Sequence, residues 1–142
     1  MSKGNTFEND LLKLIFNATA IANIADNAAS SPLTNLRISL HTADPGEGGS
    51  QTTNEATYGA YARVNVARTT AGWTVASNSV SPAANISFPT ATSGTNTITH
   101  FGVGTATSGA GKLLYKGTVT PNISVVAGVT PRLTTASAIT ED

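Results

Sequence analysis

The sequence predicts a mainly β fold, a jelly roll or β-sandwich of about seven or eight short antiparallel strands with an N-terminal helical segment. Apolar and polar residues alternate from residue 36 onward, and Gly and Pro interrupt this alternation at short intervals. A single stretch of helical period precedes it. We therefore expect a helical segment over 1–32, packed on the β domain or on a neighbouring molecule, and a β domain over 33–142.

The helical pattern covers residues 5–28, where apolar side chains recur at spacings of three and four, beginning with Phe7 and Leu11. Asn5 followed by Glu8 has the form of a capping box in which Asn replaces the usual Ser or Thr, so we expect the helix to begin there. Asn and Thr residues weaken the middle of the pattern, which fits one helix or two short ones.

The strands expected after the helix share a period of two and are bounded by turn residues. They cover 36–42, 61–68, 73–75, 85–88, 97–105, 112–119, 123–126 and 133–139. The turn at 69–72 predicts a hairpin between the second and the third of them. Glycines within 97–105 leave space for a second backbone, from the same domain or from another chain.

The composition favours a protein that associates with other proteins. Charged residues make up 11% of the chain, less than half of the roughly 25% that is typical, and Thr, Ser and Asn supply about a third. Because charge normally keeps sheet edges apart, a nearly neutral β surface favours association. The basic residues are scattered and the net charge is zero, so we expect no binding to nucleic acid.

The sequence lacks the features of disulfide-bonded, membrane-spanning and secreted proteins. The chain has no Cys, so it forms neither disulfides nor thiolate metal sites. Its apolar runs are too short to span a membrane, and its first residues lack the layout of a secretory signal. We expect a soluble protein that is made in the cytoplasm.

An acidic, glycine-rich loop over 44–55 is the most polar part of the chain. Asp44, Glu47 and Glu55 are weak candidate ligands for a hard cation such as calcium. Their spacing does not match an EF-hand, and Asp-Pro-Gly is ordinary turn chemistry. An exposed loop that touches a neighbouring subunit is the favoured interpretation, and we expect neither metal nor cofactor.

Ser39, His41 and Asp44 are close enough in sequence to suggest a nucleophile, a base and an orienting acid. A flat strand is not expected to aim the Ser39 hydroxyl at the imidazole across a substrate, and no nucleophile elbow surrounds it. We therefore expect no enzyme. Tyr58, Tyr61 and Trp73 could form an aromatic patch for a sugar or a protein, but packing within a hairpin is favoured.

Five segments together resemble a family of small tailed-phage virion proteins that are labelled tail fibre or head decoration proteins. The resemblance runs from about Leu11 to Glu141. The segments that carry it are Leu36–Gly46, Tyr61–Val64, Ile86–Pro89, Thr97–Gly104 and Gly111–Tyr115.

The resemblance implies a non-enzymatic structural protein of the virion, made in the host cytoplasm. Capsid decoration is preferred: a dimer or trimer that binds the major capsid protein and stabilises the head lattice. The alternative is a tail or tail-fibre protein that binds other tail proteins. In either case the helix and the long loop are the expected contact regions, with the candidate interface residues Phe7, Leu11, Asp44, Glu47, Glu55, Tyr58 and Tyr61.

Overall fold

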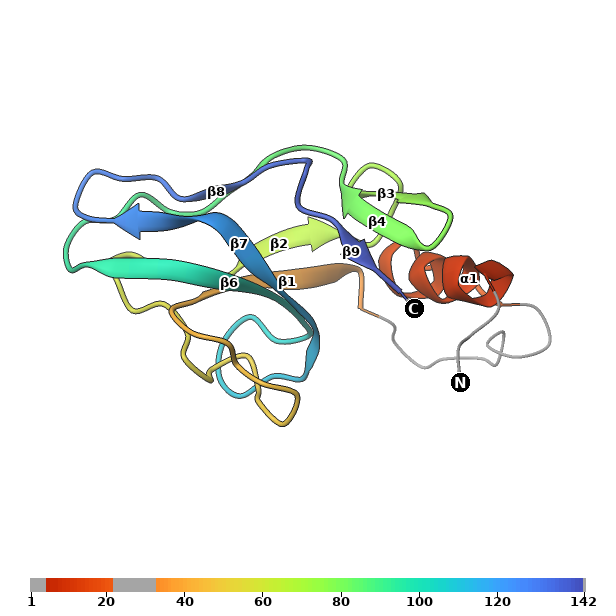
Figure 1. The fold of residues 1–142 in the computed structure, drawn as a ribbon, viewed down its shortest axis with the longest axis horizontal. Helices are drawn as coiled ribbons and strands as arrows, with labels where there is room; N and C mark the ends of the chain where they lie inside the picture. Colours follow the sequence, from red (N-terminus) through yellow and green to blue (C-terminus); the bar gives the residue numbers. More distant parts are fainter. Residues whose placement is uncertain (1–4, 22–32, 142) are drawn as a thin grey trace. The chain divides into compact units, whose positions relative to one another are not determined.

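The computed structural model describes residues 5–21 and 33–141 (Figure 1). The chain forms two compact units, each assembled from segments that are distant in sequence. Within the described residues, no helix is long and apolar enough to cross a membrane. The segments of the first unit are Met1–Asn35, Ala67–Asn85 and Thr134–Asp142, and those of the second are Leu36–Val66 and Ile86–Leu133.

The first unit packs one helix on a small antiparallel sheet. Helix α1 (Asn5–Phe16) packs on β3 (Trp73–Ala76) and β4 (Ser79–Pro82), and the sheet order is β3-β4-β9, with β9 at Ile139–Thr140. Because apolar residues recur on one face of α1, Leu12 and Phe16 are fully buried. The Phe16 ring meets the Trp73 indole edge to face, with centroids 4.7 Å apart.

Helix α1 is shorter than the predicted 5–28. It ends at Phe16, the backbone then turns through Ala18 at a φ of 52°, and residues 17–21 are not helical. Arg68 stops the helix by donating to the carbonyl oxygens of Ile15 at 2.6 Å and Leu14 at 2.8 Å, which have no partner within the helix. The predicted part over 22–28 and the side chain of Asn5, the expected cap, lie outside the described residues.

The second unit contains a four-stranded sheet and a two-stranded one. The larger has the order β2-β1-β6-β7, and the smaller pairs β5 with β8. Their bounds are β1 Asn35–His41, β2 Val64–Ala67, β5 Ile86–Ser87, β6 Asn96–Gly104, β7 Leu113–Val125 and β8 Arg132–Leu133. The expected mainly β class is confirmed: the sheets are antiparallel and the arrangement is sandwich-like, without closure into a barrel.

Alternation along the central strands places the core of this unit on one face of the larger sheet. Ile38 of β1 lies opposite Val103 of β6, and Leu40 lies opposite Phe101; all four side chains are buried. From the smaller sheet, Ile86 and Leu133 are buried as a pair, as is Phe88 just beyond β5. The opposite face of β1 carries Ser39 and His41, which are also fully buried.

One predicted strand pairing and one predicted strand were wrong. Strand β3 does not form a hairpin with the segment 61–68: it pairs with β4, which the sequence analysis missed, across the two-residue turn Ser77–Asn78. Pro82 made that segment look like a turn, but it lies at the strand end, opposite Trp73. The predicted strand over 133–139 is likewise two short strands, β8 and β9, which join different sheets.

Strand β7 is continuous where the sequence predicted a break at Pro121. Its register with β6 shifts there, because Ile98 pairs with Ile123 whereas His100 pairs with Thr118. The residues between these partners bulge opposite Thr99. Proline is tolerated at this position because β7 is an edge strand, whose irregular part needs fewer ladder hydrogen bonds.

Candidate functional site

Two loops of the second unit meet at one end of the larger sheet. The first, residues 42–55, follows β1, and the second, residues 105–112, joins β6 to β7. The backbone N–H of Gln51 donates to the carbonyl of Gly111 at 3.0 Å, which ties one loop to the other. In Figure 1 they are the gold and cyan loops below the sheet. We call these two segments together the loop surface.

Gln51 is the main link between the loops. Its side chain is fully buried, and its Oε1 accepts from the backbone N–H of Thr105 at 3.0 Å and of Ala106 at 2.9 Å. Its Nε2 donates to the carbonyl of Arg37 at 3.4 Å. Both ends of the amide are therefore paired, as a buried polar group requires.

Glycines make room for this side chain. A Cβ at Gly104 would overlap the Gln51 amide, and a Cβ at Gly111 would overlap its Oε1. The sequence analysis expected the β6 glycines to admit a second backbone. Instead, the side chain of Gln51 occupies the space at Gly104, and those of Ser39 and His41 approach Gly102.

Ser39 and His41 form a hydroxyl–imidazole pair that is joined by a direct hydrogen bond and not arranged across a substrate. Residues two apart share a strand face, and Gly102 opposite leaves room for them, so Ser39 Oγ lies 2.9 Å from His41 Nε2. The other ring nitrogen, Nδ1, lies 2.8 Å from the Thr53 carbonyl and not against Asp44. Both side chains have zero solvent exposure, and burial lowers the pKa of His41 below its usual 6.5.

A second polar cluster, centred on Arg63 just before β2, connects the two loops of the loop surface. The guanidinium of Arg63 binds both carboxylate oxygens of Glu55, at 2.6 and 2.7 Å. It also donates to the carbonyls of Ala106 at 2.9 Å and Gly109 at 2.8 Å in the second loop. The hydrogen bond with Glu55 raises the pKa of Arg63, so this cation keeps its charge.

Tyr61 completes that cluster. Its hydroxyl donates to Glu55 Oε1 at 2.9 Å and accepts from the backbone N–H of Leu40 at 3.0 Å. Burial raises the pKa of Tyr61 far above its usual range and that of Tyr58 to about 12. Tyr58 is only 3% exposed, and its ring meets Tyr61 edge to face. Trp73 lies in the first unit, so the three-residue aromatic patch considered from sequence is divided between the units.

The three weak metal candidates do not share a site. Asp44 is exposed and pairs with Lys116, whose ammonium lies 2.9 Å from its Oδ1 and lowers its pKa. Glu55 is committed to Arg63, and Glu47 is exposed. Among the described residues, no three His, Cys, Asp or Glu side chains are grouped so that they could hold a metal ion.

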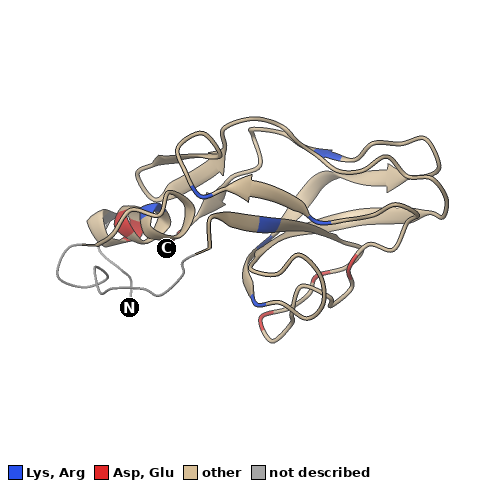
Figure 2. Cartoon of the chain, turned by 180° about the vertical axis from the view of Figure 1, so that it is seen from behind, with Lys and Arg blue, Asp and Glu red and all other residues tan. Residues whose placement is uncertain are grey.

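The remaining interface candidates differ in exposure. Phe7 is 41% exposed on α1 and Leu11 is half-buried, both in the first unit. On the loop surface, Asp44 and Glu47 are exposed and Glu55 is half-buried. Outside it, Tyr61 is half-buried and Tyr58 is buried. In Figure 2 acidic residues gather on the helix and on the loops, whereas Lys and Arg are spread along the chain.

Sequence reasoning missed Gln51 and the role of Arg63. A single Gln in a polar loop carries no pattern, and its partners at 105 and 106 lie 54 and 55 residues away. The available signal was indirect: a glycine at 104, where the β pattern would place a side chain, indicated that something else fills that space.

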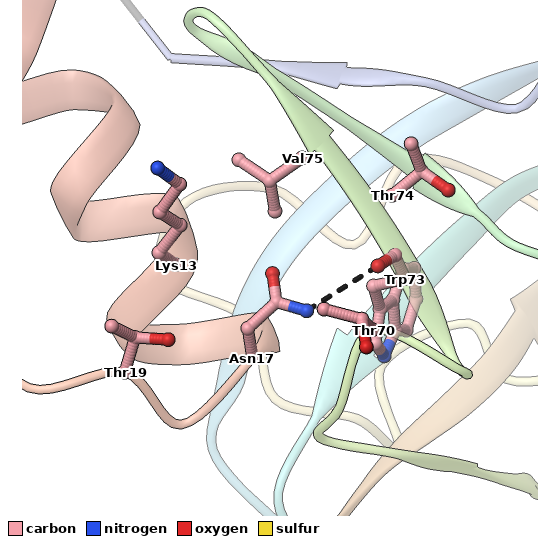
Figure 3. A pocket seen from close by; sticks show the side chains of 7 residues that line it. All are labelled: Lys13, Asn17, Thr19, Thr70, Trp73, Thr74 and Val75. Carbon is pink, nitrogen blue, oxygen red and sulfur yellow. Dashed lines mark hydrogen bonds between the residues drawn. The ribbon is translucent and has the colours of Figure 1, made fainter.

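The first unit has a separate cavity of about 240 Å³ between the end of α1 and β3 (Figure 3). Asn17 crosses it to donate to the carbonyl of Trp73 at 3.3 Å. The remaining lining side chains are those of Lys13, Thr19, Thr70, Thr74 and Val75. Surface threonines and a single lysine do not converge on one ligand chemistry, so this cavity is a weaker candidate than the loop surface.

Comparison with known proteins identifies the family. A family model described as "Podophage GP4 fiber I protein gp80" matches residues 2–140. No curated protein matches the chain. The resemblance to small tailed-phage virion proteins is thereby confirmed, and a phage fibre protein is a component of the virion. The chain belongs to the podophage GP4 fiber I protein gp80 family.

Proposed function

We propose that this chain is a non-enzymatic structural component of a phage tail fibre and binds other virion proteins through its loop surface. The observation that carries the proposal is the family match over residues 2–140. The description of that family as a fibre protein supports the tail-fibre alternative better than the capsid decoration preferred from the sequence.

The geometry of the loop surface supports a binding role. Its backbone is held by Gln51 and by the Arg63–Glu55 pair, while Asp44, Glu47 and Lys112 are exposed. A loop that is already ordered loses little conformational entropy when it binds a partner. The hydroxyl–imidazole pair is fully enclosed, which supports a role in packing and not in catalysis.

Self-association into dimers or trimers remains part of the proposal. It is supported by the low charge of the chain and by the edge strand β7. Sedimentation of the isolated protein tests this part: a monomer at all concentrations would contradict it and leave the fibre assignment untouched.

Electron microscopy of particles that carry an epitope tag on this chain tests the location. We expect label on the tail and few copies per particle. Label distributed over the head, with a copy number that matches the capsid lattice, would contradict the proposal and restore capsid decoration.

A charge reversal tests the loop surface. Glu47→Arg changes an exposed side chain without touching the buried clusters, so we expect a folded protein whose incorporation into particles falls. Arg132→Glu on β8, also exposed and in the same unit, is the matched control. Equal incorporation of the two variants would contradict the contact role of the loop surface.

A further inference from the structure

His41 occupies a position where the loop surface and the sheet share one titratable group. It ends β1, and its imidazole bridges Ser39 of the same strand and the Thr53 carbonyl of the first loop. Arg63 and Glu55 are also coupled to it electrostatically, and His100 lies directly opposite on β6. We propose that His41 is a pH-sensitive latch, which holds residues 42–55 against the sheet when neutral and releases them when protonated.

The hydrogen bonds define the neutral form. A carbonyl oxygen can only accept, so Nδ1 must carry the proton that is donated to Thr53. Nε2 is then unprotonated and accepts from the Ser39 hydroxyl. In the imidazolium, Nε2 carries a proton and would donate to the Ser39 hydroxyl. That hydroxyl would then have to donate to the Gly102 carbonyl, which lies 3.4 Å away.

Burial of the ring outweighs the two groups that favour its cation, the Thr53 carbonyl and the Glu55 carboxylate. A Cβ at Gly102 would lie 2.8 Å from Nε2 and 2.7 Å from Ser39 Oγ, so a water molecule does not fit on that side of the ring. The nearest carboxylate, Glu55, already pairs with Arg63 and Tyr61. Arg63 and His100 both disfavour a positive charge on His41, as does burial, which dominates.

Release of the loop is the easiest way for the cation to reach water. The alternative is to move β1, which lies between β2 and β6 and contributes Leu36, Ile38 and Leu40 to the core. Detaching residues 42–55 breaks the hydrogen bonds of Gln51 and Glu55 but exposes few apolar side chains, so it leaves the apolar core intact. We expect the core strands to stay folded while the loop opens.

The pH range in which the loop opens follows from the direction in which the His41 pKa is shifted. The pKa of His41 is lowered in the closed state, whereas an exposed imidazole titrates near 6.5. The latch is therefore fully effective above about 6.5 and weakens as the pH falls below that value. With one proton taken up on opening, the opening equilibrium rises up to about tenfold for each pH unit below 6.5.

Hydrogen exchange on the isolated protein tests the latch. Protection factors of the Gln51 and Ala106 amides, whose hydrogen bonds to the Gly111 carbonyl and to Gln51 Oε1 join the two loops, should fall as the pH passes below 6.5, while those of β1 and β6 stay constant. His41→Gln should abolish this dependence. His100→Gln, which removes the half-buried imidazole opposite, should retain it.

Nuclear magnetic resonance titration of the His41 ring in the unmodified protein keeps the test decisive if His41→Gln does not fold. A midpoint below 6.5, together with the Nδ1–H tautomer, is expected. A midpoint at or above 6.5, or loop protection that ignores pH, would overturn the latch. The latch rests on the proposed contact role of the loop surface. Equal incorporation of Glu47→Arg and Arg132→Glu would refute only that role, and head-labelled particles would refute only the tail location, since exchange is measured without particles.

Discussion

Gly104→Ala tests how the loop surface is held. A Cβ at this position would lie 2.5 Å from Gln51 Nε2 and overlap its Cδ, so the Gln51 side chain must leave its niche. The N–H of Ala106 then loses the acceptor it has at 2.9 Å, and one buried unpaired donor costs about 1–3 kcal/mol. Overpacking adds about 1–3 kcal/mol. We expect the free energy of unfolding to fall by about 2–6 kcal/mol.

A double-mutant cycle isolates this cause. Gln51→Ala alone loses the same hydrogen bonds but empties the niche, so Gly104→Ala should then add almost nothing, and the coupling energy should be about as large as the cost of Gly104→Ala by itself. Gly102→Ala is the matched control, since its Cβ would approach Ser39 and His41 and not Gln51. Urea unfolding followed by circular dichroism measures all four variants. Additive free energies for positions 104 and 51 would refute the reasoning.

Two predictions concern the first unit. Arg68→Gln should destabilise it by about 2–3 kcal/mol, because the carbonyls of Leu14 and Ile15 lose charge-assisted donors at the end of α1; Arg132→Gln, an exposed control, should change stability by less than about 0.5 kcal/mol. Equal thermal midpoints for both would contradict the capping role. Ser77→Gly should stabilise by about 0.5–1 kcal/mol, because Ser77 has a φ of 55°, which Gly adopts without strain; a lowered midpoint would show that the turn needs the serine.

The elements that the sequence predicted well are those whose pattern is local. Alternation from Leu36 to Leu40 records that one face of β1 is buried, and the same holds from Ile98 along β6. Both strands were predicted within a few residues of their bounds. The sequence predicted helix α1 but not its end at Phe16. The last carbonyls of the helix bind Arg68, which lies more than 50 residues further along the chain.

The same distinction applies to the loop surface. The sequence drew attention to residues 44–55 through composition, and to Ser39 and His41 through their spacing. It could not show that the Ser39 hydroxyl points at the imidazole, because the orientation depends on the space above Gly102 in another strand. Gln51 and Arg63 left no local sign of their roles.

By itself, the sequence determined a mainly β chain of low charge with an N-terminal helical segment, since composition and period are properties of neighbouring residues. Only the tertiary structure decided that β3 pairs with β4 and not with the segment 61–68, that Val80 of β4 meets Ile139 near the C-terminus, and that Gln51 occupies the niche at Gly104. The contacts of Val80 and Gln51 join residues far apart in the chain, and the energies of all three arrangements depend on packing and hydrogen-bond partners that no local pattern records.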